Sequence, residues 1–233
     1  MKRTLESSFQ ELSETVPATI GIAIAPVNGS SVASFGTWST GVAWSTVKVP
    51  LAIAALRAGS ACPDLVAKTI TQSDNAAAEE LWSRLGDPAE AAKKVHLVIR
   101  DAGDTTTVVE PRRLRAGYTA FGQTQWSLVR QAQFAARLLR IRNASRVVDL
   151  MHNLTADHRW GLAAKGFAAK GGWGPGTRDD YLVRQFAIVP IGSGTVGVAL
   201  AAEAHDGGFE TGVDVVNTLT DWLVDRLPEL TQD

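Results

Sequence analysis

Residues 44–51 read Trp44-Ser45-Thr46-Val47-Lys48-Val49-Pro50-Leu51 and run into a segment rich in Ala, Leu and Ile. Ser45 and Lys48 are three positions apart, a spacing that places two side chains on one face of a helix within hydrogen-bond reach. A serine hydroxyl is a weak nucleophile until a neighbour takes its proton, and a lysine does so only when burial or a second cation lowers its pKa. A plain core helix would explain the apolar residues but not the lysine among them. We therefore expect Ser45 to be a nucleophile at a helix N-terminus, with Lys48 as its base and Pro50 bending the first turn.

Two further motifs follow in order along the chain. Ser73-Asp74-Asn75 precedes an Ala-rich helical segment, and Lys170-Gly171-Gly172 opens a glycine-rich stretch. Taken singly, the first of these is typical of a helix cap and the second of a turn. Taken with residues 44–51, they add a hydroxyl, an amide and a second cation to the expected nucleophile and base, which indicates serine acyl transfer.

The order, spacing and flanking residues of the three motifs resemble those of the class A β-lactamases and the penicillin-binding DD-peptidases. The resemblance covers most of the chain and implies a role for each motif residue. Ser45 would become acylated and Lys48 would accept its proton. Ser73 would relay a proton to the leaving amine, and Asn75 would donate its amide to the substrate and contact Lys48.

The same resemblance places substrate-binding groups on the third motif. Lys170 would hold Ser73 and the substrate carboxylate, and the glycine-rich strand Gly171-Gly172-Trp173 would line the substrate. The backbone N–H groups of Ser45 and Trp173 would form an oxyanion hole, often the largest single contribution to acyl transfer. The chain has Gly171 where the family usually has Thr or Ser, so a hydroxyl for the substrate carboxylate is missing. Arg184, on the next expected strand, either replaces it with a guanidinium or faces outward as an ordinary strand arginine.

The pattern along the chain predicts an α+β fold in which an antiparallel sheet is interrupted by helices. Alternating or apolar runs predict strands at 19–26, 31–35, 181–189 and 195–202, and helices close both ends of the chain. The N-terminal helix carries Leu5, Phe9, Leu12 and Val16 on one face. We expect one catalytic domain over 1–233, with an α/β subdomain from 1–43 plus 160–233 and a helical subdomain over 44–159. The 28 residues from Ser45 to Ser73 are fewer than the family usually has, so the helical part is expected to be shortened.

Composition limits the classes of partner. The chain has 233 residues, a formal net charge of −1 and one cysteine, Cys62. It therefore carries no basic footprint for nucleic acid, and no intramolecular disulfide is possible. The acyl chemistry requires neither metal nor organic cofactor, and the four histidines are expected to be ordinary surface or packed residues. We expect a monomer that acts on a small-molecule or peptidoglycan-derived substrate.

The cellular compartment stays open. The family acts outside the cytoplasm, yet no continuous apolar stretch follows Met1-Lys2-Arg3, so no signal peptide is expected in this sequence. No run reaches the length of a transmembrane segment. Either an export segment is missing from the sequence or the protein stays inside the cell.

The rate of deacylation distinguishes a hydrolase from a module that only binds its ligand. A β-lactamase needs a carboxylate that activates water, and Glu110-Pro111 lies near the expected place. Aligning instead on residues 103–107 puts Arg113 at that place, so Glu110 is either this base or an ordinary loop carboxylate. The main hypothesis is a serine hydrolase of β-lactams, D-alanyl peptides or esters. The alternatives are a non-hydrolysing module that binds penicillin or senses cell-wall fragments, and a structural domain with accidental motifs.

Overall fold

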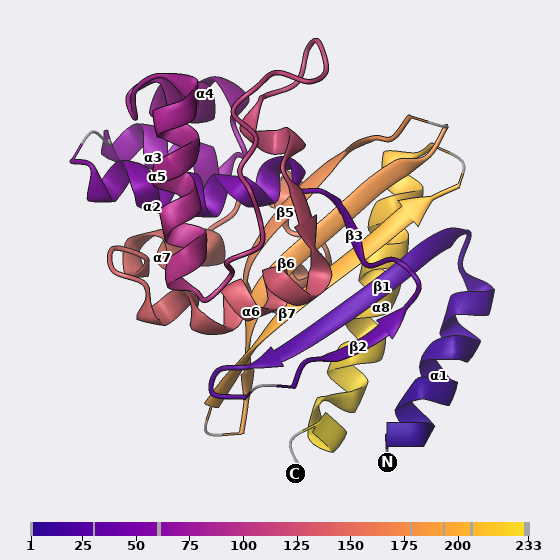
Figure 1. The fold of residues 1–233 in the computed structure, drawn as a ribbon. Helices are drawn as coiled ribbons and strands as arrows, with labels where there is room; N and C mark the ends of the chain where they lie inside the picture. The colour runs from indigo at the N-terminus through magenta and orange to yellow at the C-terminus, as the bar shows by residue number, and fades with distance from the viewer. Residues whose placement is uncertain are drawn as a thin grey trace.

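A five-stranded antiparallel sheet forms the centre of the molecule, in the strand order β2-β1-β7-β6-β5 (Figure 1). The computed structural model describes residues 2–29, 31–59, 62–177, 179–192, 194–205 and 207–230. The strands are β1 (Ala18–Pro26), β2 (Ala33–Gly36), β5 (Ala168–Pro175), β6 (Tyr181–Ile191) and β7 (Gly194–Ala204). Met1, at the charged start considered above as a signal peptide, lies outside the described residues.

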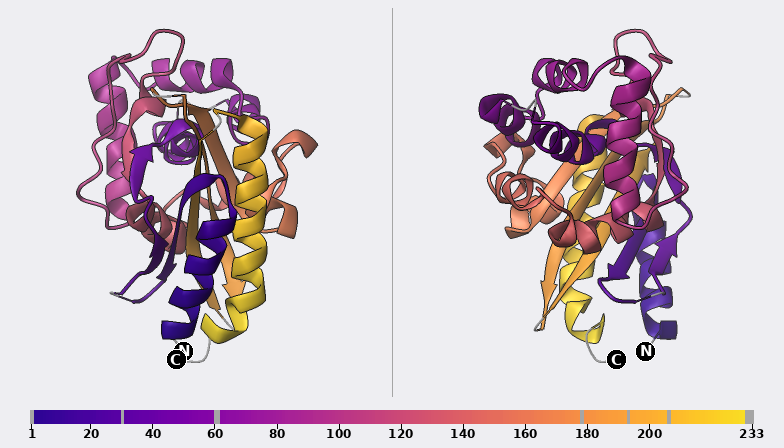
Figure 2. Two further views of the ribbon diagram at one scale, coloured as in Figure 1. Left: turned by 90° about the vertical axis from the view of Figure 1, so that its right-hand side faces the viewer. Right: turned by 60° about the vertical axis from the view of Figure 1, so that its left-hand side comes forward.

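The three inner strands are apolar along most of their length because both faces of the sheet are covered. Ile22 of β1 pairs with Leu200 of β7, and both are completely buried. Helices α1 (Lys2–Thr15) and α8 (Phe209–Leu230) lie against one face (Figure 2). Phe9 packs edge-to-face on Trp222 with ring centroids 5.0 Å apart. The amphipathic N-terminal helix is therefore confirmed, and so is the predicted α+β class with its flanking terminal helices.

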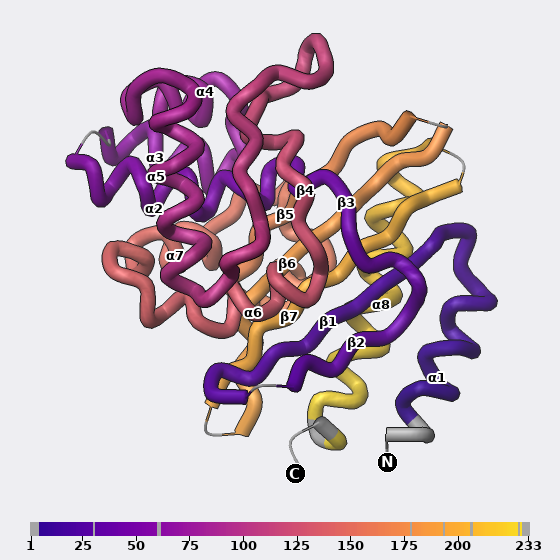
Figure 3. The backbone as a smooth tube through the Cα atoms, viewed as in Figure 1, coloured from indigo at the N-terminus to yellow at the C-terminus, as the bar shows by residue number. Residues whose placement is uncertain are grey.

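The other face of the sheet carries the helical part of the chain, which Figure 3 traces as one group to one side of the strands. Its elements are α2 (Lys48–Arg57), α3 (Pro63–Thr71), α4 (Asn75–Ser83), α5 (Pro88–Asp101), α6 (Leu128–Arg137) and α7 (Ser145–His152). Helix α6 lies on β7 and β1. A two-stranded sheet of β3 (Thr40–Val42) and β4 (Gln125–Ser127) completes this layer. None of the helices in the described ranges combines the length and hydropathy that a bilayer span requires.

Short 3₁₀ helices connect these elements: η1 (Trp44–Val47), η2 (Phe121–Gln123), η3 (Leu138–Arg140), η4 (Ala156–His158) and η5 (Gly161–Lys165). The sequence pattern predicts Ser45 and Lys48 on one bent helix. In the structure Ser45 lies in η1 and Lys48 is the first residue of α2. Pro50 falls in the first turn of α2, where a missing N–H is tolerated, so the chain changes from 3₁₀ to α-helix before it.

Candidate active site

The hydroxyl of Ser73 lies between two buried lysine amines. Lys170 Nζ donates to Ser73 Oγ at 2.8 Å, and Lys48 Nζ lies 3.3 Å from the same oxygen. Lys48 also donates to the Ser73 carbonyl and to Asn75 Oδ1, the latter at 2.7 Å. Two helix ends and one strand thus bring together four of the residues that the motifs singled out.

Burial makes the ammonium forms of both lysines stronger acids than that of free lysine, so both lose a proton more easily. Each lysine side chain is about one per cent exposed. Loss of water around Lys48 lowers its pKa from 10.5 to about 7, although the negative charge of Asp74 opposes this shift. Burial also lowers the pKa of Lys170 well below its usual value, and the neighbouring Lys48 lowers it further. An amine with a pKa near neutrality exists partly as a free base at pH 7, as a proton acceptor must.

The turn that carries Ser45 rests on strand β5. A Cβ atom placed on Gly172 would lie 2.8 Å from the backbone nitrogen of Ser45 and 2.9 Å from that of Thr46. A Cβ on Gly174 would meet the Trp44 ring at 2.4 Å. Glycine at these two positions therefore lets the strand approach the turn. Trp44, which precedes Ser45, has the left-handed φ of 50° that non-glycine residues rarely adopt.

Ser45 itself is half-buried, and its relation to Lys48 differs from the expectation. Within the described ranges no hydrogen bond joins Ser45 Oγ to Lys48 Nζ. The reason is that Ser73 O, Ser73 Oγ and Asn75 Oδ1 already take the three donors of the Lys48 ammonium group. Lys48 has to lose a proton before it can accept one from Ser45.

A helix cap holds the loop around Ser73. Ser73 has a left-handed φ of 51°. Asp74 caps α4 by accepting a hydrogen bond from the backbone of Ala77 at 2.6 Å. The cap fixes where α4 begins and so fixes the direction in which Asn75 leaves the helix.

Comparison with known proteins gives no match to a family model and none to a curated protein. Solved structures match over nearly the whole chain. The TLA-3 extended-spectrum β-lactamase has a TM-score of 0.78 at 12% identity, covering 97% of this chain and 99% of that one. A β-lactamase from Chitinophaga pinensis has a TM-score of 0.76 at 15% identity, covering 95% and 98%. A class A β-lactamase from Mycobacterium abscessus has a TM-score of 0.75 at 16% identity, covering 96% and 99%.

The chain has the β-lactamase fold. The fold class and the family resemblance drawn from the three motifs are thereby confirmed at the level of architecture. At these identities the likeness concerns the fold, and the roles of the individual residues remain predictions.

The expectation that Arg184 binds a substrate carboxylate is wrong, and so is the alternative of an outward-facing arginine. Arg184 is completely buried. Its guanidinium donates to the carbonyls of Gly41, Val42 and Trp126 and to Gln131 Oε1, at 3.0 to 3.1 Å. Gln131 in turn donates to Thr46 Oγ1 at 2.9 Å, next to Ser45. Arg184 therefore ties β6 to the small sheet and supports the turn of Ser45 from behind.

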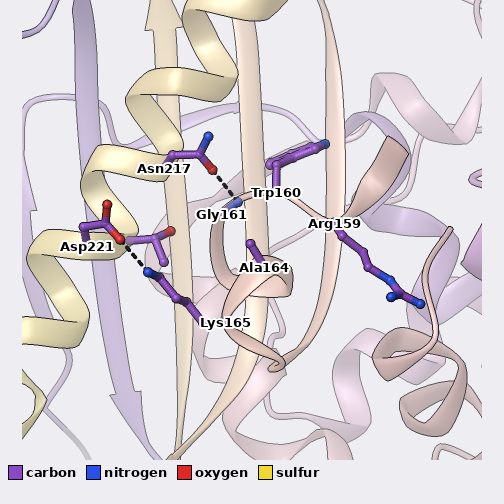
Figure 4. A pocket seen from close by; sticks show the side chains of 8 residues that line it. Arg159, Trp160, Gly161, Ala164, Lys165, Asn217 and Asp221 are labelled. Carbon is purple, nitrogen blue, oxygen red and sulfur yellow. Dashed lines mark hydrogen bonds and ion pairs between the residues drawn. The ribbon is translucent and has the colours of Figure 1, made fainter. Parts of the chain in front are cut away.

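The missing hydroxyl at Gly171 has a steric explanation. A Cβ at Gly171 would lie 2.6 Å from two atoms of the Trp160 ring, so Trp160 occupies the space that a threonine side chain would need. Trp160 also lines a pocket of about 270 Å³ together with Lys165, Asn217 and Asp221 (Figure 4). In that pocket Lys165 pairs with Asp221 at 2.7 Å, and Asn217 accepts a hydrogen bond from the backbone of Gly161.

Glu110 lies in a loop whose start is anchored by Asp104. The Asp104 carboxylate is fully buried and accepts hydrogen bonds from the backbone of Thr106 and from Trp126 Nε1, at 3.0 and 3.1 Å. The Glu110 carboxylate itself forms an ion pair with Arg112, whose Nε lies 3.1 Å away. These hydrogen bonds from Arg112 lower the pKa of Glu110. Arg113, the other residue considered for this place, pairs with Glu79 at 2.9 Å.

Proposed function

We propose that this protein is a serine acyl hydrolase that forms an acyl-Ser45 intermediate with a β-lactam, a D-alanyl peptide or an ester. One observation carries the proposal: the Ser73 hydroxyl lies between the amines of Lys48 and Lys170, both stripped of water. Such an arrangement is costly for stability unless one amine is neutral, and a neutral buried amine is a competent base.

In the proposed reaction neutral Lys48 accepts the proton of Ser45 Oγ, which attacks the substrate carbonyl carbon. The backbone N–H groups of Ser45 and Trp173 stabilise the oxyanion. When the tetrahedral intermediate collapses, Ser73 gives its proton to the leaving nitrogen or oxygen, and the proton on Lys48 restores Ser73. Lys170 attracts the substrate carboxylate, and Asn75, Gly171 and Gly172 line the acyl group. Water then hydrolyses the ester and regenerates Ser45.

The engagement of Glu110 favours a second candidate, a module that binds penicillin or cell-wall fragments and releases them slowly. Glu110 accepts hydrogen bonds from Arg112, so its carboxylate is already engaged and has to leave Arg112 before it could activate a water. Acylation in that case proceeds while hydrolysis of the ester is slow. Both candidates take a small-molecule or peptidoglycan-derived ligand and share the acyl-Ser45 species.

Intact-mass spectrometry over time tests both candidates, with a penicillin and a D-alanyl ester as separate substrates. The wild type gains the mass of the acyl group, whereas Ser45→Ala does not. Ser34→Ala, which removes an exposed hydroxyl on β2, reacts like the wild type. Rapid loss of the adduct indicates a hydrolase and a lasting adduct indicates the binding module. Acylation of Ser45→Ala at the wild-type rate contradicts the proposal.

A further inference from the structure

His158, at the end of η4, lies beside the loop that carries Ser73. Its side chain is 14% exposed, and Nε2 lies 2.8 Å from the carbonyl oxygen of Gln72. Its Nδ1 is buried and has no hydrogen-bond partner in the described part of the chain. A carbonyl oxygen only accepts hydrogen bonds, so Nε2 must carry the proton. In a neutral ring Nδ1 then carries no proton.

A second residue of the same segment holds the preceding carbonyl. Thr155 donates to the carbonyl of Thr71 from both its backbone nitrogen and its hydroxyl, each at 3.0 Å. The segment 155–158 therefore binds the two carbonyls that come just before Ser73. Because the left-handed φ of 51° at Ser73 is disfavoured for a serine, it persists only where neighbouring groups hold it.

The ring of His158 also contacts the strand of the third motif. Its centroid lies 5.2 Å from that of Trp173, and Trp173 packs further on Trp160 and Phe209. His158 thus touches two of the three segments that form the site, the Ser73 loop and strand β5.

We propose that His158 is a positioning residue, which holds Ser73 between Lys48 and Lys170 by donating from Nε2 to the Gln72 carbonyl. The inference rests on the proposed acyl transfer and adds a residue that the motifs do not contain. His158 touches neither substrate nor reacting atoms in this scheme, and it acts through the backbone of residues 72 and 73.

Charges around the ring favour the neutral form that this role requires. The positive groups that face it are Lys170 and Lys48, and the negative group is Asp157, whose carboxylate lies 3.6 Å away and is mostly exposed. Burial is the largest influence and lowers the pKa of His158, and both lysines lower it further. The backbone hydrogen bond to Gln72 and the charge of Asp157 act in the opposite direction.

Two substitutions separate the hydrogen bond from the packing of the ring. His158→Gln keeps an N–H donor at the position of Nε2 and removes the ring, whereas His158→Phe keeps a ring against Trp173 and removes the donor. His152→Gln is the matched control, because His152 is exposed and contacts a backbone carbonyl, that of Gly166, at 3.2 Å.

The acylation rate of Ser45 is measured for all three variants, together with thermal unfolding. We expect His158→Gln and His152→Gln to react close to the wild-type rate and His158→Phe to react about tenfold more slowly. The opposite order for the two His158 variants, with Phe tolerated and Gln slow, would show that the ring only packs and would overturn the inference.

Nuclear magnetic resonance gives a readout that does not require acylation. The ¹⁵N shifts of the His158 ring should report a proton on Nε2, and the backbone amide signals of Ser73, Asp74 and Asn75 should move in His158→Phe but not in His158→Gln. A proton on Nδ1, or amide signals that stay in place in both variants, contradicts the inference. If no substrate acylates the wild type, the proposed function fails while these signals still decide the role of His158.

Discussion

At the scale of single residues, the chemistry depends on how far burial lowers the pKa of Lys48. Among the described residues, the Lys48 amine donates to a carbonyl and an amide oxygen and pairs with no carboxylate, and the negative charge of Asp74 raises its pKa. The burial that makes Lys48 a base therefore also destabilises the folded protein whenever Lys48 is charged.

The first prediction concerns stability as a function of pH. The pKa of Lys48 falls from 10.5 to about 7 on folding, so between these values the unfolded chain holds a proton that the folded protein lacks. The free energy of unfolding therefore rises with pH across this window, by about 5 kcal/mol at most from this group, and is level below it. Urea unfolding at pH 6 to 10 should show a smaller rise for Lys48→Met than for the wild type. Parallel curves for the two proteins would contradict the shift.

The second prediction concerns the pH dependence of acylation. The rate should rise with pH through about 7, where Lys48 loses its proton. Because the charge of Asp74 raises this pKa, Asp74→Asn should move the midpoint to lower pH while asparagine still caps α4. Rates of acyl-enzyme formation from pH 5 to 9 test this. A midpoint that stays or moves upward shows that Asp74 does not act on the base.

At the scale of elements, the site depends on how closely β5 approaches η1. Gly172 and Gly174 face this turn, and any side chain there would push the turn of Ser45 away from the strand. Gly171 is also crowded, but against the Trp160 ring and not against backbone. The strand thus carries two kinds of glycine, one that sets the geometry of the nucleophile and one that accommodates an aromatic side chain.

The third prediction compares these glycines. Gly172→Ala should slow acylation about 100-fold, because a Cβ 2.8 Å from the Ser45 nitrogen displaces the nucleophile and the oxyanion donors together. Gly171→Ala should slow it less, because the atoms in the way belong to the Trp160 ring and not to the backbone of the Ser45 turn. Acylation rates and melting temperatures are measured for both. Equal rates in the two variants would show that the approach of β5 to η1 does not control the reaction.

At the scale of the whole molecule, the site lies where three distant segments meet: residues 44–48, 73–75 and 170–174. Arg184 links the large sheet, the small sheet and, through Gln131, the turn after Ser45. The acceptors of Arg184 in the described part of the chain are all neutral, which is unusual for a buried cation, and burial lowers its pKa to about 9. Its role is to satisfy carbonyls that the junction of the two sheets leaves without partners.

The fourth prediction follows from that role. Arg184→Met leaves three backbone carbonyls and the Gln131 amide oxygen without this donor, so it should destabilise the protein by about 3 kcal/mol. Arg146→Met, on the exposed side of α7, should change stability by less than about 0.5 kcal/mol. Urea unfolding measures both. A variant as stable as the wild type would mean that loss of the buried charge offsets the lost hydrogen bonds.

Local patterns were sufficient for four of the five strands of the large sheet, the terminal helices and the three motifs, because residue spacing and apolar periodicity express contacts that the chain makes with its nearest neighbours or with a covered face. They did not indicate the glycine-rich strand β5, which has no apolar alternation. They were sufficient to single out Lys48, Ser73, Asn75 and Lys170 as a set. The direction of Arg184, the contacts of Glu110 with Arg112 and the place of His158 depend on segments that lie far away in the chain. A strand position is compatible with a buried or an exposed arginine, and an isolated histidine has no spacing to recognise. Side-chain orientation and the pKa values that follow from burial arise from packing between distant elements. Only the tertiary structure, which brings the three segments together, therefore decided them.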